Sequence, residues 1–396
     1  MLYSVLLDSD GISGRKVRGK MSKRKKSKAV PVVIVLTVLF AAAAVACFYA
    51  GDWVTAQKAS ALKNVQDQVV AHNEAERDKY AAAMADFERE TSSGANLAWP
   101  AQKSEGWDVL DLTSYPLESP STVTMSRSQI MNNGLLLINQ WHSRPEDFDE
   151  STMVGLGNYF NWAVQVADAS VSLFPVAADA LKAALDDAAA EDLTHYMVPE
   201  AYRTWDTQNT YFQNRVERLS SKYTGDALIE AAKKEVNYPG TSEYNSGLSF
   251  RLQLYDRNDK EINNTKYSTS SQGVWMNENC WKYGLVFRFP LNAWPLPTST
   301  DKSFVTGISG QHNLYRYVGK GSAALMHYMD FCLEDYIQYM EEHPHVALFE
   351  DGQLKYEYYR QYVGEEASFD ILITGRAKSY VSSLDNMGGV ITVFEY

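Results

Sequence analysis

The segment YPGTSEYNSGLSFRLQLYD, from Tyr238 to Asp256, has the pattern of a metal-binding loop that runs into a β-strand. A catalytic zinc ion needs three protein ligands, usually histidines or carboxylates, and one open position for the water that it activates. This segment contains no histidine. The sequence therefore predicts the turn and strand of such a site without its metal chemistry.

Four motifs follow one another along the chain: AYRTWDTQ, PGTSEYNSGLSF, WMNENCWKYGLVFRFP and YRYVG. Their order resembles that of the VanY-like D-alanyl-D-alanine carboxypeptidases, zinc peptidases that trim the stem peptide of peptidoglycan. Four motifs in one order are far more specific than a single match. The resemblance implies a carboxypeptidase-like domain, which we place at residues 126–342.

The family's metal and base positions carry other residues here. In the family, a histidine and an aspartate of the central motif bind zinc, and a later motif supplies the general-base glutamate and a third ligand. By the resemblance these positions are occupied by Tyr244, Arg251, Gln311 and Leu314. A fixed cation at the position of Arg251 repels a dication. We therefore expect no catalytic residue and no bound zinc, and the protein is predicted to be a pseudoenzyme.

A rearranged metal site is the alternative that leaves the protein an active zinc carboxypeptidase. The chain has seven histidines, and His312, two residues before the lost ligand at Leu314, is the weak candidate for a substitute ligand. The other histidines fall outside the motif positions: His72, His142, His195, His327, His343 and His345.

The positions that contact substrate in the family match this sequence better than the metal positions do. By the resemblance these are Arg203, Gln208 and Ser242, and a guanidinium can bind a peptide's terminal carboxylate through two parallel hydrogen bonds. A departure lies beside Arg203, because the family's Ser-Gly-Tyr-Arg becomes Glu200, Ala201, Tyr202 and Arg203. The added carboxylate could compete with a substrate carboxylate. A structural role also stays open, in which Arg203 pairs with Glu243 or another acid and the protein is a scaffold.

The segments around the motifs indicate an α+β fold, because strands and helices alternate irregularly. Helices are predicted at 174–193, with Val176 turned inward, at 206–223, with Tyr211 turned inward, at 225–236, at 272–284 and at 322–343. Residues 135–139 are predicted to form a strand. Residues 94–125 form a linker with a first strand, and 343–396 a small β subdomain with a hairpin at Asp351-Gly352.

The N-terminal part indicates a membrane anchor. Residues 1–28 carry nine Lys and Arg and two Asp, and residues 29–50 form an uncharged, mostly apolar stretch long enough to span a bilayer. The basic flank predicts a cytoplasmic N-terminus, with everything after the anchor extracytoplasmic. Residues 51–93 follow as a helical stalk. A lipoprotein signal ending at Cys47 is the alternative anchor.

Charge limits the partners. The net charge of the chain is −12, and with +7 in residues 1–28 the remainder carries −19, so no nucleic-acid partner is expected. The expected partners are the membrane, a peptidoglycan stem peptide or a cell-envelope protein. Beyond Cys47 only Cys280 and Cys332 remain. Buried free thiols are the ordinary state of two such residues, and a disulfide is the alternative.

Overall fold

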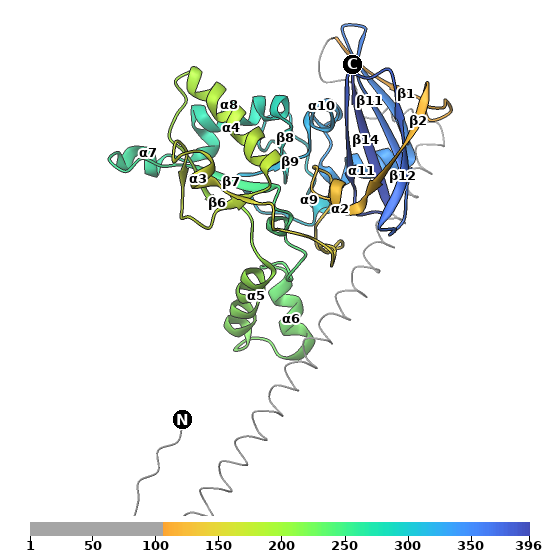
Figure 1. The fold of residues 1–396 in the computed structure, drawn as a ribbon. Coiled ribbons are helices and arrows are strands. Elements are labelled where there is room, and N and C mark those ends of the chain that lie inside the picture. The colour runs from red at the N-terminus through yellow and green to blue at the C-terminus, as the bar shows by residue number, and fades with distance from the viewer. Residues whose placement is uncertain (1–105) are drawn as a thin grey trace, which may run out of the picture. The chain divides into compact units, whose positions relative to one another are not determined.

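The computed structural model describes residues 106–396, and a mixed five-stranded sheet lies at the centre of the carboxypeptidase-like part (Figure 1). Its strand order is β4 (Gln165–Val166), β6 (Tyr196–Glu200), β7 (Ser249–Leu254), β9 (Leu314–Tyr317) and β8 (Leu285–Phe287). All pairings are antiparallel except that of β4 with β6. The α+β class and a largely antiparallel central sheet are therefore observed in the described part.

Helices and short turns surround this sheet. The longer helices are α4 (Pro175–Ala190), α5 (Trp205–Leu219), α6 (Gly225–Lys233), α8 (Ser271–Asn279), α10 (Lys320–Met329) and α11 (Leu333–Glu342). The shorter ones are α2 (Arg127–Ile130), α3 (Leu156–Tyr159), α7 (Lys260–Asn264), α9 (Ser303–Thr306) and the 3-10 turns η1 (Glu243–Ser246), η2 (Tyr267–Thr269) and η3 (Cys280–Tyr283). A two-stranded ribbon joins β3 (Val154–Gly155) to β5 (Ser172–Leu173).

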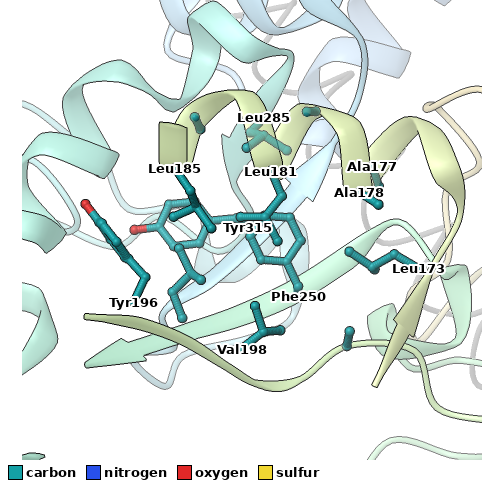
Figure 2. Close-up of a cluster of buried hydrophobic side chains, with 14 of the residues drawn as sticks. Leu173, Ala177, Ala178, Leu181, Leu185, Tyr196, Val198, Phe250, Leu285 and Tyr315 are labelled. Atoms are coloured by element: carbon teal, nitrogen blue, oxygen red, sulfur yellow. The ribbon is translucent and has the colours of Figure 1, made fainter. Parts of the chain in front are cut away.

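The main core lies between α4 and the central sheet. Leu181 and Leu185 of α4 point toward Phe250 of β7 and Tyr315 of β9, all of them buried (Figure 2). The helix starts with proline at its first position and continues with alanines, which allow the helix to lie close to the strands. The Tyr315 hydroxyl donates to Asn277 Oδ1 at 2.6 Å, so the polar end of this buried ring is satisfied.

The C-terminal strands form a second sheet that also recruits the first described strand. Its order is β1 (Trp107–Asp111), β10 (His345–Glu350), β11 (Gln353–Tyr362), β14 (Gly389–Glu395) and β13 (Ser379–Leu384). The remaining strands, β2 (Pro120–Ser126) and β12 (Ser368–Thr374), pair with each other. Residues 106–125 thus pair with strands from residues 343–396, about 240 positions later.

The second sheet packs onto the carboxypeptidase-like part through α10 and α11. Tyr358 of β11 is fully buried, and its hydroxyl donates to the carbonyl of Gly321 at the start of α10. Leu325 and Ile337 share this core with Leu348 of β10. The tyrosine-rich β11 therefore uses at least one aromatic ring for packing.

Three details of the predicted elements differ from the structure. Residues 135–138 are buried but pair with no strand, because other groups take their backbone bonds: the carbonyl of Leu136 accepts from Arg316, and the N–H of Leu137 donates to Asp385. The predicted helix at 322–343 is broken at Asp330, whose φ of 56° is left-handed. The predicted helix at 272–284 ends at Asn279 and continues as η3.

Two predicted core residues are exposed. Val176 in the first turn of α4 and Tyr211 of α5 have 37% and 44% of their surfaces accessible. Val176 borders a cavity of about 450 Å3 between α4 and β13, and Tyr211 borders the pocket described below. Helical spacing identified the apolar positions of each helix but not which of them meets a cavity.

Cys280 and Cys332 are free and buried in the structure. Burial raises the pKa of the Cys280 thiol to about 12, which keeps it protonated and unreactive at neutral pH. No helix within residues 106–396 is both long and apolar enough to cross a bilayer. The predicted basic tail, anchor at 29–50 and stalk at 51–93 lie outside the described residues.

Candidate functional site

A pocket of about 900 Å3 lies where the ends of β6, β7 and β9 meet the loop before β7. Its walls come from Glu200 and Arg203 after β6, the segments 241–244 and 306–314, and the end of α6. Seven of the eight residues singled out from the sequence line it: Arg203, Gln208, Ser242, Tyr244, Arg251, His312 and Leu314. Gln311, at the position of the general base, is not among the lining residues.

The loop from Tyr238 to Gly247 keeps its Pro-Gly pattern for a structural reason. Gly240 and Gly247 adopt φ angles of 83° and 66°, which favour glycine, and a Cβ at Gly247 would lie 2.8 Å from the ring of Phe174. The loop also holds the backbone of Arg203, which donates to the Tyr244 carbonyl and accepts from the Asn245 amide. The conformation of the loop therefore positions Arg203 at the pocket.

Two of the positions at which the resemblance implies zinc ligands, Arg251 and Leu314, lie side by side on the sheet. Arg251 of β7 is directly opposite Leu314 of β9 on one side and Glu200 of β6 on the other. Partners that face each other across antiparallel strands point to the same face, so these three side chains are neighbours. An arginine and a leucine thus occupy adjacent positions at which the resemblance implies two zinc ligands.

These residues do not fit zinc. Leucine has no ligand atom, a guanidinium has only N–H donors, and burial raises the pKa of the Tyr244 phenol to about 12, so its oxygen stays protonated. Within residues 106–396, no group of three or more His, Cys, Asp and Glu side chains is arranged to hold a metal ion. We therefore derive no catalytic step through zinc at these positions.

Arg203 is held by the protein itself. Its Nε and Nη2 atoms contact Glu200 Oε1 at 2.6 and 2.5 Å, and Nη1 donates to Gln208 Oε1 at 2.9 Å. Its guanidinium also lies 4.1 Å from the centre of the Tyr244 ring and 4.9 Å from that of Tyr211. The carboxylate that the sequence adds at Glu200 is thus the internal partner of Arg203.

The pair of Glu200 and Arg203 also separates two cavities. Both residues and Tyr211 line the main pocket and a second cavity of about 480 Å3 that extends toward Glu150 and Asp168. A ligand carboxylate that binds the Nε–Nη2 edge of Arg203 must replace Glu200. The sequence signalled Glu200 as a departure from the family motif, whereas nothing in the helical pattern of α5 distinguished Tyr211 as a pocket residue.

Gln208 and Ser242 lie at the pocket but are buried. The Gln208 amide nitrogen donates to the Asn237 carbonyl at 2.7 Å, while its oxygen accepts from Arg203. The backbone N–H of Ser242 donates to Asn245 Oδ1 at 3.3 Å. Both ends of the Gln208 side chain are engaged within the protein, so this residue supports Arg203.

Glu243 belongs to a separate buried ion-pair network. Its carboxylate accepts from Arg288 at 2.7 Å and from Arg316, and Arg288 binds both oxygens of Glu334 at 2.7 and 2.8 Å. Burial would raise the pKa of Glu243, but the two guanidinium groups outweigh it and hold the pKa below its usual value. The possible pairing of Arg203 with Glu243 is therefore not observed, since Glu200 takes that role.

His312 reaches the pocket without a second nitrogen or sulfur ligand beside it, because the lining contains no other histidine or cysteine among the described residues. Loss of hydration lowers the pKa of His312, and the positive charges of Arg251 and Arg203 lower it further. Elsewhere, His195 pairs with Asp256, His343 with Asp111 and His345 with Glu357. The structure therefore does not bring the histidines together.

Arg251 differs from Arg203 in having no protein partner for its guanidinium among the described residues. Within residues 106–396, its buried Nε donates to no hydrogen-bond acceptor, and no carboxylate forms an ion pair with its guanidinium. Leaving a buried donor unpaired is unfavourable. The pocket is cationic overall, since Arg203, Lys233, Lys234 and Arg251 line it against Glu200, Glu235 and the internally paired Glu243.

Comparisons with known proteins agree with the motif order. Residues 170–297 match the family model described as VanY: D-alanyl-D-alanine carboxypeptidase. A D-alanyl-D-alanine carboxypeptidase of Enterococcus faecium is 27% identical over 280 residues, which cover 70% of this chain and 80% of that protein. A D-alanyl-D-alanine carboxypeptidase of Enterococcus faecalis is 31% identical over 154 residues, 39% of this chain and 51% of that protein.

A solved structure shows the same fold. The vancomycin resistance D,D-dipeptidase VanXYg, in complex with a D-Ala-D-Ala phosphinate analogue, superimposes with a TM-score of 0.51 at 19% identity, over 70% of this chain and 99% of that one. The resemblance drawn from the motifs is thus confirmed, and this chain is similar in sequence to the VanY D-alanyl-D-alanine carboxypeptidases.

Proposed function

We propose that the protein is a non-catalytic relative of the D-alanyl-D-alanine carboxypeptidases that binds the C-terminal end of a peptidoglycan stem peptide. The observation that carries the proposal is the pocket itself. It has a volume of about 900 Å3 and a cationic lining, and Tyr244, Arg251 and Leu314 line it at the positions where the resemblance implies metal ligands. A cavity kept open and lined by arginines suits a ligand that ends in a carboxylate.

The same residues argue against hydrolysis by the family's chemistry. Attack on a peptide carbonyl needs an activated water and a base within hydrogen-bond reach. Gln311 at the base position is a neutral amide that does not line the pocket, and Glu200 is engaged by Arg203. A bound peptide would therefore meet donors for its carboxylate, but neither a metal-activated water nor a glutamate at the position where the resemblance implies the base.

Two other functions are tested beside this one. His312 is the observation that favours an active zinc peptidase with a rearranged site, since its lowered pKa keeps the imidazole neutral and able to bind a metal. The pairing of Arg203 with Glu200 favours a scaffold that binds a cell-envelope protein elsewhere and takes no small ligand. The proposed function differs from both in requiring peptide binding without hydrolysis.

We also propose where the domain works. Residues 29–50 would anchor the protein in the cell membrane, with residues 1–28 cytoplasmic and the carboxypeptidase-like domain outside. The support is the basic cluster beside an uncharged apolar stretch of sufficient length. Labelling of whole cells with an impermeant reagent should modify cysteines introduced into the domain and spare those introduced into residues 1–28. The reverse pattern would overturn this topology.

The function is tested with N-acetyl-Lys-D-Ala-D-Ala and the purified full-length chain. Isothermal titration calorimetry should detect binding of this peptide, and chromatography should detect no released D-alanine, with or without added zinc. Release of D-alanine that chelator abolishes would establish the active-enzyme alternative. Absence of binding together with absence of release would leave the scaffold.

A further inference from the structure

We propose that Arg251 is the residue that binds the terminal carboxylate of the ligand, at the position where relatives hold a metal ion. The inference rests on the proposed function and specifies its anchor. Arg203, the arginine that the family resemblance points to, is then a positioning residue held by Glu200. The ligand class is a peptide or amino acid with a free C-terminal carboxylate.

The first support is the state of the Arg251 guanidinium. Its buried Nε has no hydrogen-bond partner, and no carboxylate among the described residues pairs with it. Arg288, Arg316 and Arg203 each have a carboxylate partner in the same domain. A ligand carboxylate would supply the charged partner that this guanidinium lacks among the described residues, and the flat fork of a guanidinium binds such a group through two bonds.

The second support is that most N–H donors of Arg203 already have partners within the protein. Glu200 engages the Nε and Nη2 atoms, Gln208 engages Nη1, and Tyr244 lies against the face of the guanidinium. Three of the five N–H donors are thus in use, and a carboxylate that binds the Nε–Nη2 edge must displace a charged partner at 2.5 Å. A carboxylate that binds Arg251 displaces no protein group.

The third support is the surroundings of Arg251. Across β7 its neighbours are Leu314 and Glu200, and Glu200 is already committed to Arg203. His312 and Arg251 line the same pocket, so an anion beside Arg251 also lies near a ring that can donate a hydrogen bond.

The test compares N-acetyl-Lys-D-Ala-D-Ala with its C-terminal amide by isothermal titration calorimetry. Wild-type protein should bind the acid at least tenfold more tightly than the amide. Arg251→Leu should remove this preference, and Arg251→Lys should retain part of it. Arg257→Leu, just beyond β7 and exposed outside the pocket, is the matched control and should behave as wild type.

The decisive comparison is with Arg203→Leu. The proposal expects this variant to keep the preference for the acid within about threefold. If Arg203→Leu abolishes the preference while Arg251→Leu retains it, the anchor is Arg203, and the inference fails although the proposed function holds. If wild-type protein binds neither peptide, the proposed function itself fails. Melting temperatures identify a variant that does not fold, and if Arg203→Leu is one, the result for Arg251→Leu alone decides.

Discussion

Replacing Glu200 with glutamine should tighten the binding of a carboxylate-terminated peptide by about tenfold. In the wild type, Glu200 contacts two nitrogens of Arg203 at 2.5 and 2.6 Å and lies on β6 directly opposite Arg251 of β7. The substitution keeps the shape of the side chain but removes its charge. It therefore frees Arg203 as a second donor and removes a repulsion between the ligand carboxylate and Glu200.

The magnitude follows from how the pair is exposed. Two unit charges about 4 Å apart near a protein surface attract by about 4 kcal/mol, while fully exposed pairs contribute only about 0.2–1 kcal/mol after solvent screening. The side chains of Arg203 and Glu200 are 18% and 24% accessible, which is between these cases. If the substitution makes the binding free energy of the ligand more favourable by about 1.4 kcal/mol, the Kd falls tenfold.

The assay is calorimetric titration of N-acetyl-Lys-D-Ala-D-Ala into wild type and Glu200→Gln. Glu235→Gln is the matched control, because it removes the same charge from the same pocket but from a residue paired with Arg215. We expect less than a threefold change for the control, and no gain for Glu200→Gln with the C-terminal amide. An unchanged or weaker affinity of Glu200→Gln for the acid would refute the reasoning that Glu200 competes with the ligand.

Three further predictions concern the network, the pH dependence and the metal positions. Glu243→Gln should destabilise the protein by about 3–5 kcal/mol in urea unfolding, since it leaves Arg288 and Arg316 buried beside a neutral amide; a loss below 1 kcal/mol would contradict the assigned network. Peptide affinity should rise as pH falls through the lowered pKa of His312, because protonation adds a positive charge to the pocket. The variant His312→Gln should abolish this rise. If the rise persists in the variant, another group causes it. A fourfold variant that restores the family's residues should bind about one zinc ion per chain by elemental analysis, and failure to do so would show that the backbone has also departed from the family's geometry. Its changes are Tyr244→His, Arg251→Asp, Gln311→Glu and Leu314→His.

Sequence reasoning placed most of the pocket because it rested on motif positions rather than on local propensity. Arg203 lies about 40–50 residues before Ser242 and Arg251, and the order of the motifs assigned all three to one pocket, which they line in the structure. The partner of Arg203 could not be chosen from the sequence. Two features of the fold decide which acid pairs with Arg203. The antiparallel register places Glu200 beside Arg251 at the pocket, and the buried network already engages Glu243.

Long-range pairing accounts for the differences in the fold. Residues 135–138 have a strand's composition, but side chains replace a neighbouring strand: the Leu136 carbonyl accepts from Arg316 and the Leu137 carbonyl from Asn386. The pairing of β1 with β10 likewise joins segments about 240 residues apart, which no local pattern encodes. Helix positions were predicted well where apolar spacing was regular, whereas the turn at Asp330 depends on a left-handed residue without glycine.

The zinc content of the purified full-length protein tests the central claim most directly. The protein would be dialysed against trace zinc and then measured by elemental analysis, with the fourfold variant as the positive control. We predict close to zero equivalents, because Tyr244, Arg251 and Leu314 provide no ligand set. Close to one equivalent would contradict the account and would direct attention to His312 and to a carboxypeptidase assay.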